Sequence, residues 1–332
     1  MIRSGHIDSF TRDRLPRPEQ MPDFSYDRPE LTYPERLNAA AALLDVWRER
    51  GWDERPCVIG NGDVWSYGRF RDTVDRIARL LAERFGIVPG NRVLVRGTNT
   101  PMLAACWLAV LKAGAVVVPT MPLLRATELE SILERAAVSL ALCDARFAKD
   151  LNAAAQAMDG SMPVVTFNGG DLEGRLEETE TGFAAVDTAA DDVALIAFTS
   201  GTTGKPKATA HFHRDLLAVA DLSPQSLLKT GGDDVFCGTP SLAFAYGQGG
   251  MLLFPLRVGA SVVLLDRATP ERLLEVTAKH KATVMFTVPT VYRAMTARIE
   301  RTRPWPRGCA RCAPASRRVS RCPPPRWRAG RR

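Results

Sequence analysis

The stretch that decides the fold of this chain is VALIAFTSGTTGKPKATAHFH, residues 193–213. It begins with an apolar run, Val193 to Phe198, which has the length and bounding of a buried strand. The run ends in a segment of hydroxyls, glycines and lysines that offers no apolar side chain to a core, Thr199 to Lys207. Gly201 and Gly204 allow backbone N–H groups to approach a ligand closely. The pattern therefore predicts a polyphosphate-binding loop placed directly after a strand.

The spacing of this segment, called the phosphate loop below, excludes the Walker class of nucleotide-binding loops. That class needs four residues between its glycines and a Ser or Thr directly after its lysine. Here two residues separate Gly201 from Gly204, and Lys205 is followed by Pro206, which has no hydroxyl for magnesium. The alternative without function is a plain surface turn. The predicted phosphate-binding residues are Thr199, Ser200, Gly201, Thr202, Thr203, Gly204, Lys205 and Lys207.

The composition is that of a globular protein with an unusual tail. The 332 residues are 45% hydrophobic and 24% charged, with a formal net charge of +7. Residues 301–332 hold eleven arginines and no acidic residue, so the other 300 residues hold 33 basic and 37 acidic side chains, a net charge of −4. Four of the seven cysteines are scattered through the body without metal-ligand spacing, namely Cys57, Cys106, Cys143 and Cys237. These cysteines and a start without an apolar signal segment predict a cytoplasmic protein. The longest apolar stretch, residues 102–118, is interrupted by Lys112 and Gly114 and predicts a buried helix and strand instead of a membrane span.

Strand-like and helix-like segments alternate along the chain after an N-terminal arm of about 35 residues. This rhythm predicts an α/β fold with mainly parallel sheets flanked by helices. The Asn61-Gly62 pair predicts a hairpin over residues 57–65, and the acidic stretch 169–188 is predicted to be an irregular connection. Further strands are predicted at 92–96, 115–119, 140–143, 164–167, 193–198, 261–265 and 283–288, and helices at 36–48, 69–86, 102–113, 126–137, 215–228, 270–279 and 290–299.

The string TSGTTGKPK resembles the phosphate loop of the adenylate-forming superfamily, which includes acyl-CoA and aryl-CoA synthetases, luciferases and the adenylation domains of peptide synthetases. The one departure is Ala208, where the superfamily has glycine. The resemblance covers residues 35–300 and implies an incomplete large N-terminal domain of that fold. The strings TMPLLRATELESILERA, LALCDARFA and PERLNAAAALLD are similar to 2-aminobenzoate–CoA ligases and benzoate–CoA ligases. This implies a small aromatic acid, ATP with Mg²⁺, and CoA as ligands, with no membrane or specific nucleic acid as partner.

The stretch SLAFAYGQGGMLLFPLRVGA supports the same branch. In benzoate–CoA ligases a matching Ala-Tyr-Gly run lines the aromatic acid pocket, which implies that Phe244, Ala245, Tyr246 and Gly247 line it here. Small residues leave room for a flat ring, and Tyr246 or Phe244 can stack on it. The alternative is that these aromatic side chains only pack a core beside a glycine turn.

Two histidines follow the phosphate loop at alternate positions, His211 and His213. In an extended segment both would face one side. A similar His-x-His follows the loop in the benzoate-ligase branch, which implies that both lie near the nucleotide or the acid. Without the resemblance, such histidines are more often structural.

The tail, residues 301–332, loses hydrophobic periodicity and is expected to be disordered. It could be a nucleic-acid-binding arm, or a metal site at Cys309, Cys312 and Cys322, which would lack a fourth ligand of the usual kind. A frameshift is the third interpretation. If reading starts on the third base of each codon from Ala310 onward, codon degeneracy permits SLRACVSAGEPLPAAT, which resembles the superfamily sequence that follows this point. The match favours the frameshift.

The resemblance implies a two-step reaction, in which an aromatic carboxylate attacks the α-phosphate of ATP and the CoA thiol then displaces AMP. The superfamily's adenine- and ribose-binding residues, its Tyr-Gly-x-Thr-Glu magnesium motif and its C-terminal lid with a catalytic lysine have no counterpart in the printed sequence. Lys205 and Lys207 belong to the phosphate loop, so we assign no catalytic residue and no metal ligand.

We therefore expect residues 1–300 to form a partial AMP-binding domain, followed by the aberrant tail and no lid domain. The expected function is that of an aryl-acid–CoA ligase, here a truncated chain that is inactive by itself. The alternative is a non-catalytic remnant that binds a partner or nucleic acid through its basic tail. The choice among 2-aminobenzoate, benzoate and hydroxybenzoates stays open, as does the oligomeric state.

Overall fold

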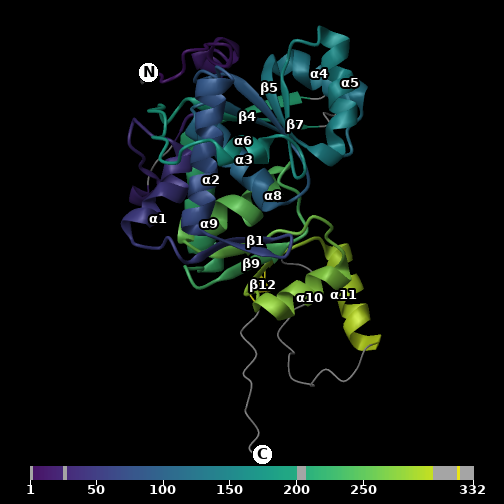
Figure 1. Cartoon of the computed structure of the whole chain (residues 1–332). Coiled ribbons are helices and arrows are strands. Elements are labelled where there is room, and N and C mark those ends of the chain that lie inside the picture. The colour runs from purple at the N-terminus through teal and green to yellow at the C-terminus, as the bar shows by residue number, and fades with distance from the viewer. Residues whose placement is uncertain (1–2, 25–27, 200–206, 302–319, 322–332) are drawn as a thin grey trace, which may run out of the picture.

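The computed structural model describes residues 3–24, 28–199, 207–301 and 320–321. Within them the chain forms two six-stranded sheets with helices between and around them (Figure 1). Sheet A has the order β6 (Val164–Phe167), β5 (Val138–Asp144), β3 (Arg92–Arg96), β4 (Val116–Thr120), β7 (Val193–Thr199) and β8 (Lys207–Phe212). Sheet B has the order β12 (Ser320–Arg321), β11 (Val284–Phe286), β9 (Val235–Gly238), β10 (Ser261–Val263), β1 (Pro56–Gly60) and β2 (Asp63–Ser66).

Both sheets are parallel except at their edges. In sheet A the strands from β6 to β7 run parallel and only β8 pairs antiparallel, with β7. In sheet B the strands from β11 to β1 are parallel, and β2 and β12 are antiparallel edges. Parallel strands need helical crossovers that cover both faces of a sheet. The predicted α/β fold with mainly parallel sheets flanked by helices is confirmed.

The helices form three layers around the two sheets (Figure 1). Between the sheets, one core joins α2 (Tyr67–Arg79), α3 (Pro101–Lys112) and α9 (Phe254–Val258). The outer face of sheet A is covered by α4 (Ala126–Ala136) and α5 (Ala148–Met158). The outer face of sheet B is covered by α10 (Pro270–His280) and α11 (Pro289–Arg301). The other α-helices of the described residues are α1 (Val46–Glu49), α6 (Leu172–Glu177), α7 (His213–Leu222) and α8 (Ala245–Gln248), and π-helical turns lie at Ala41–Asp45, Leu80–Arg84, Ser223–Leu228 and Gly249–Leu253.

Helix α3 shows why the apolar stretch predicted to be buried lies at the centre of the molecule. All twelve of its residues are buried, so it has no polar face that could meet water. Its start is fixed by Thr100, whose hydroxyl accepts a hydrogen bond from the Leu103 amide at 3.2 Å, and by Pro101 in the first turn. Among the described residues, no helix combines the length and the hydropathy required to cross a bilayer.

The predicted hairpin at Asn61-Gly62 and the predicted helix at 270–279 are confirmed, and the Thr269 hydroxyl caps that helix by accepting the Arg272 amide at 3.2 Å. The structure also contains elements that the sequence did not predict. Helix α6 lies inside the acidic stretch 169–188, which was expected to be irregular. The sequence also did not predict α5, β8, β9 and the helical turns from α8 to α9. Within the tail, Ser320–Arg321 pairs with β11 as β12, and the rest of residues 302–332 lies outside the described residues.

Residues 3–24 and 28–35 follow the surface with three short 3-10 turns, as the predicted arm does. The arm is attached at Asp192, just before β7, where the carboxylate accepts hydrogen bonds from the Ser4 hydroxyl and from the Gly5 amide, the latter at 2.8 Å. It is attached again at Asp8, which accepts from Arg92 and from the Asn91 side chain. The arm therefore braces the base of the β7–β8 hairpin.

Candidate functional site

The β7–β8 hairpin carries the phosphate loop. β7 begins buried and becomes exposed toward its end, and Thr199 at its end pairs with Lys207 at the start of β8. The Thr199 hydroxyl donates to the Lys207 carbonyl at 3.5 Å. Residues 200–206 lie outside the described residues, so the structure places only Thr199 and Lys207 of the predicted loop. The strand before the loop is confirmed, and the phosphate-binding role of the loop stays a prediction.

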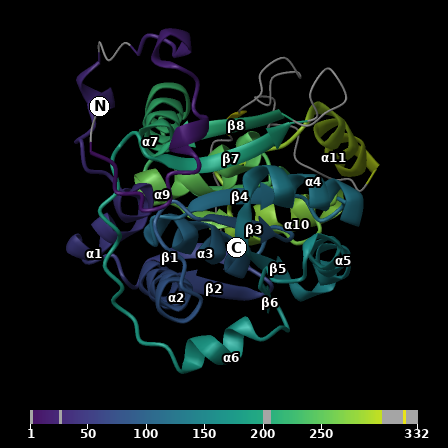
Figure 2. The same cartoon turned by 90° about the horizontal axis from the view of Figure 1, so that it is seen from above.

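The loop leaves sheet A at the carboxyl end of its parallel strands. The segments that follow β3 and β5 leave sheet A at this same edge, and the segments after β9 and β10 leave the corresponding edge of sheet B. Open parallel sheets bind their ligands outside the carboxyl ends of the strands. Figure 2 shows β8 and β7 at one side of sheet A, with α7 beside them. The ligand-binding site is therefore expected at this edge.

The predicted acid-binding run follows β9 in sheet B. Phe244 precedes α8, and Ala245, Tyr246 and Gly247 form its first turn. Phe244 is 49% exposed and Tyr246 39% exposed, whereas Gly247 is buried. The side chain of Tyr246 lies edge-on against Phe286 of β11, with ring centroids 5.6 Å apart, and its hydroxyl donates to the Thr287 carbonyl at 3.4 Å. The partly exposed aromatic side chains of Phe244 and Tyr246 therefore flank Ala245 at the carboxyl edge of sheet B.

Gly247 is required by the loop that precedes it. A Cβ atom at this position would lie 1.9 Å from the Ser241 carbonyl oxygen, which is a backbone atom and cannot swing away. That carbonyl accepts the Phe244 amide at 3.1 Å. The first turn of α8 is thus pressed against the loop 240–242, so the path of this loop sets the position of the acid-binding run.

The two histidines are separated in the structure. His211 lies on β8, whereas His213 is the first residue of α7 and is fully buried, so the expectation that both face one side of an extended segment is wrong. The chain turns into a helix because Asp215 accepts the Phe212 amide at 2.8 Å and so caps α7. At about 3.3 Å per residue, the length of β8 places His213 ~20 Å from Lys207. The proximity of His211 and His213 to the nucleotide or acid stays a prediction.

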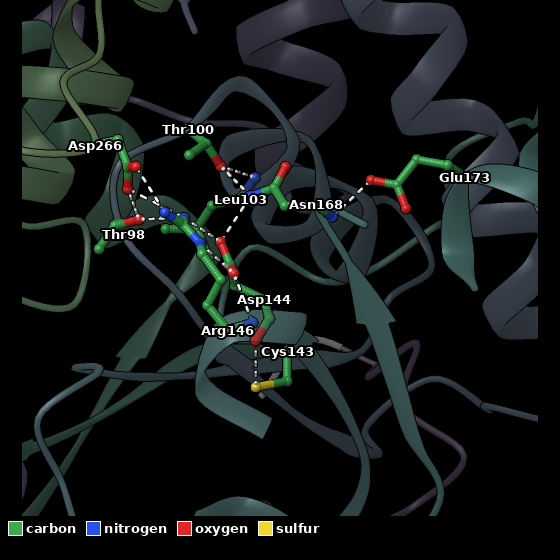
Figure 3. A network of polar contacts seen from close by, with 9 residues as sticks. All are labelled: Thr98, Thr100, Leu103, Cys143, Asp144, Arg146, Asn168, Glu173 and Asp266. Carbon is green, nitrogen blue, oxygen red and sulfur yellow. Dashed lines mark hydrogen bonds and ion pairs between the residues drawn. The ribbon is translucent and has the colours of Figure 1, made fainter. Parts of the chain in front are cut away.

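A charged network joins the two sheets at the same edge (Figure 3). Arg146, just after β5, donates to Asp144 at 2.6 and 2.8 Å and to Asp266, after β10, at 2.6 and 3.1 Å. Thr98, after β3, donates its hydroxyl to Asp266, and Asn168, after β6, donates to Asp144 at 2.7 Å. The Arg146 guanidinium therefore ties sheet A to sheet B.

The electrostatics of this network are set by Arg146. Burial alone would raise the pKa of Asp144, but hydrogen bonds from Arg146 and Asn168 outweigh it and hold that pKa below its usual range. The hydrogen bond from Arg146 also lowers the pKa of Asp266. Both carboxylates thus stay ionised near neutral pH. The sequence pointed to none of these residues, although Asp144, Arg146 and Asp266 each lie within three residues of the end of a predicted strand.

A separate cavity of about 520 Å³ lies at the start of α2, away from the carboxyl edges. Its lining includes Asp53, Arg69 and Arg71. Arg71 donates to Asp53 at 2.5 Å, and Arg69 pairs with Asp63 at 2.7 Å. Because these charges form ion pairs and the lining is mostly polar, we do not assign this cavity to an aromatic acid.

The comparisons with known proteins define the class of this protein. The family described as AMP-binding enzyme matches residues 46–318, and the chain belongs to this family. The chain is 31% identical to the benzoate–CoA ligase of Thauera aromatica over 283 residues, which are 83% of this chain and 53% of that protein. It is 29% identical to a 4-hydroxybenzoate–CoA/benzoate–CoA ligase of Rhodopseudomonas palustris, with 78% and 49% covered.

Solved structures agree with this assignment of the fold. The benzoate CoA ligase of Burkholderia xenovorans LB400 has a TM-score of 0.71 and 25% identity, covering 78% of this chain and 52% of that one. The anthranilate CoA ligase AuaEII, solved in complex with anthranoyl-AMP, has a TM-score of 0.73 and 22% identity, with 80% and 52% covered. The chain spans about half the length of these relatives.

Proposed function

We propose that this chain carries the ATP-phosphate site and part of the acid site of an aryl-acid–CoA ligase. The observation that supports the proposal is that two strands of parallel sheets end next to the predicted segments: β7 of sheet A ends at Thr199, where the phosphate loop begins in the sequence, and Phe244–Gly247 follows β9 of sheet B. The likeness to benzoate– and hydroxybenzoate–CoA ligases supports the chemistry.

In the proposed reaction, an oxygen of the aromatic carboxylate forms a bond to the α-phosphorus of ATP, and the bond from that phosphorus to the bridging oxygen breaks to release pyrophosphate. The CoA thiolate then attacks the acyl carbon and AMP leaves. Both partners of the first step are anions, so positioning and charge neutralisation carry much of the catalysis. Thr199, Lys207 and the loop between them would hold the β- and γ-phosphates, and Mg²⁺ would accompany ATP.

The acid would be small and aromatic. The small and exposed Ala245 leaves space for a flat ring, and Phe244 and Tyr246 offer faces for stacking, each such contact being worth about 0.5–1.5 kcal/mol beyond area burial. We propose 2-aminobenzoate or benzoate as the substrate.

Direct binding to the purified 332-residue protein tests the proposal. We expect 2-aminobenzoate, followed by its own fluorescence, and ATP, followed by calorimetry, each to bind saturably. Lys207→Ala should weaken ATP about tenfold, since a hydrogen bond to a charged group contributes roughly 1.5–3 kcal/mol, and should leave 2-aminobenzoate within twofold. The matched control is Lys149→Ala, an exposed lysine on α5, which should change neither affinity. Absence of binding of both ligands, or equal binding of aliphatic acids such as hexanoate, would overturn the proposal.

A further inference from the structure

One buried carboxamide links the two segments of the proposed site. Asn99 follows β3 in sheet A and is 5% exposed. Its Nδ2 donates to the Pro240 carbonyl at 2.7 Å, and its Oδ1 accepts the Leu242 amide at 2.9 Å. Both partners belong to the loop that leads from β9 of sheet B to α8. Asn99 therefore holds, from the sheet that carries the phosphate loop, the loop that precedes the acid-binding run.

The two residues next to Asn99, Thr98 and Thr100, are held by hydrogen bonds of their side chains. The hydroxyl of Thr98 contacts Asp266, which follows β10 of sheet B, and the hydroxyl of Thr100 caps α3 by accepting the Leu103 amide. Residues on both sides of Asn99 are thus held by their own side chains, Thr98 by the segment after β10 and Thr100 by the start of α3. Because both neighbours of Asn99 are held in this way, the Asn99 side chain can set the position of the loop that it binds.

The bound loop in turn fixes the acid-binding run. Gln248, which is 2% exposed, donates its Nε2 to the Leu242 carbonyl at 3.1 Å. The Ser241 carbonyl accepts the Phe244 amide and leaves no room for any side chain at Gly247. A shift of the loop 240–242 would therefore move the first turn of α8 with it.

We propose that Asn99 is a positioning residue for the aromatic acid. It touches neither acid nor nucleotide but sets where Phe244–Gly247 lie relative to the sheet that carries the phosphate loop. This inference rests on the proposed role of Phe244–Gly247 in binding the acid. Asparagine suits the task because its short side chain offers one donor and one acceptor, which match one carbonyl and one amide two residues apart on the loop. Aspartate keeps the acceptor but presents a carboxylate to the Pro240 carbonyl.

The test compares the affinities of two ligands in matched variants of the full chain. Asn99→Ala should raise the Kd for 2-aminobenzoate about tenfold, the effect of losing a buried hydrogen-bonded anchor, and leave the Kd for ATP within twofold. The control is Asn38→Ala. The Asn38 carboxamide is also buried and also bonds backbone groups, with its Nδ2 donating to the Leu111 carbonyl at 2.9 Å, but it lies away from the loop 240–242. It should lower the melting temperature and leave the Kd for 2-aminobenzoate within twofold.

Two outcomes overturn the inference. One is an unchanged Kd for 2-aminobenzoate in Asn99→Ala. The other is an equal loss of both ligands in both variants, which would show that Asn99 acts only through global stability.

A second measurement decides the matter if Asn99→Ala does not fold or if wild-type protein binds no acid. Hydrogen exchange of peptides covering residues 239–250 should be faster in the near-isosteric Asn99→Asp than in wild type, while strand β7 keeps its protection. Unchanged exchange over residues 239–250 would overturn the positioning role. Failure of wild-type protein to bind 2-aminobenzoate, together with this faster exchange, would instead refute the acid-binding role of Phe244–Gly247 and leave the anchoring of the loop by Asn99 intact.

Discussion

Acidification should destabilise this protein through His213. The ring is fully buried at the start of α7, and its Nδ1 accepts the Ala39 amide at 3.1 Å. Burial lowers the pKa of His213 from 6.5 to about 3, with a further lowering from His6 and an opposing effect of Asp192. Because the pKa is lower in the folded state than in the unfolded one, the neutral ring contributes stability that is complete above pH 6.5 and is lost as the pH falls toward 3.

The size of the effect follows from the two pKa values. Between pH 7.5 and pH 5.0 the unfolded state takes up nearly one proton at His213 and the folded state almost none, which lowers the free energy of unfolding by about 2 kcal/mol. His213→Asn removes the titration and keeps an acceptor oxygen near the position of Nδ1. The variant should be less stable at pH 7.5, because the smaller side chain leaves a cavity. Over the same pH interval it should lose about 2 kcal/mol less than wild type.

Urea unfolding followed by circular dichroism at about pH 7.5, 6.5, 5.5 and 5.0 measures how the free energy of unfolding changes with pH in wild type and in His213→Asn. The control is His280→Asn, because the partly exposed ring of His280 at the end of α10 bears less of the cost of burial, and its removal should change the pH dependence less. If His213→Asn and wild type lose stability in parallel, within about 0.5 kcal/mol, then His213 is not the group that resists protonation and the reasoning fails.

Two further substitutions test the core and the acid-binding run. The side chain of Lys112 is 3% exposed and contacts Asp75, which is also buried. Lys112→Met would leave that carboxylate buried without its partner and should lower the free energy of unfolding in urea by about 3–5 kcal/mol. Adding Asp75→Asn should restore part of this loss. Gly247→Ala would place its Cβ against the Ser241 carbonyl and should raise the Kd for 2-aminobenzoate more than about tenfold by fluorescence titration. Gly174→Ala, with no atom within 4 Å of the added Cβ, should leave that Kd unchanged, and a loss equal to that of Gly247→Ala would refute the steric argument.

Much of the fold could be predicted because its strands and crossover helices carry strong local patterns. β3 and β6 match their predicted ranges, and α3, α4 and α10 differ from theirs by a residue or two. Helix α5 was missed because its buried face consists mostly of alanines, which give a weak hydrophobic period. Helix α6 was missed because only Leu172 and Leu176 are buried within an acidic stretch. In both, tertiary packing stabilises what the local sequence signals weakly.

The candidate site likewise contains residues that a local sequence pattern identifies and residues that no local pattern connects. The phosphate loop could be proposed from the sequence because its residues are contiguous and chemically unusual. Arg146 and Asp266 are 120 residues apart, and Asn99 and Pro240 are 141 apart, so no local pattern could join them. The available signal was positional, since parallel strands bring their carboxyl ends to one edge. Reading the polar residues just after each predicted strand would have found Asn99, Asp144, Arg146 and Asp266.

The two links between the sheets differ in charge, and burial explains the difference. The side chain of Arg146 is 41% exposed, so its guanidinium keeps contact with water while it binds Asp266. Asn99 is almost completely buried, where an ion pair would cost more in desolvation than it returns unless every group were paired, and a neutral carboxamide with two partners avoids that cost. The charged link tolerates solvent at the rim, while the neutral link holds the interior loop. In the proposed reaction a carboxylate has to reach a triphosphate, so the separation between the two proposed sites has to be fixed. The interior link at Asn99 is the one placed to fix it, because it alone of the two bonds the loop that leads into the acid-binding run.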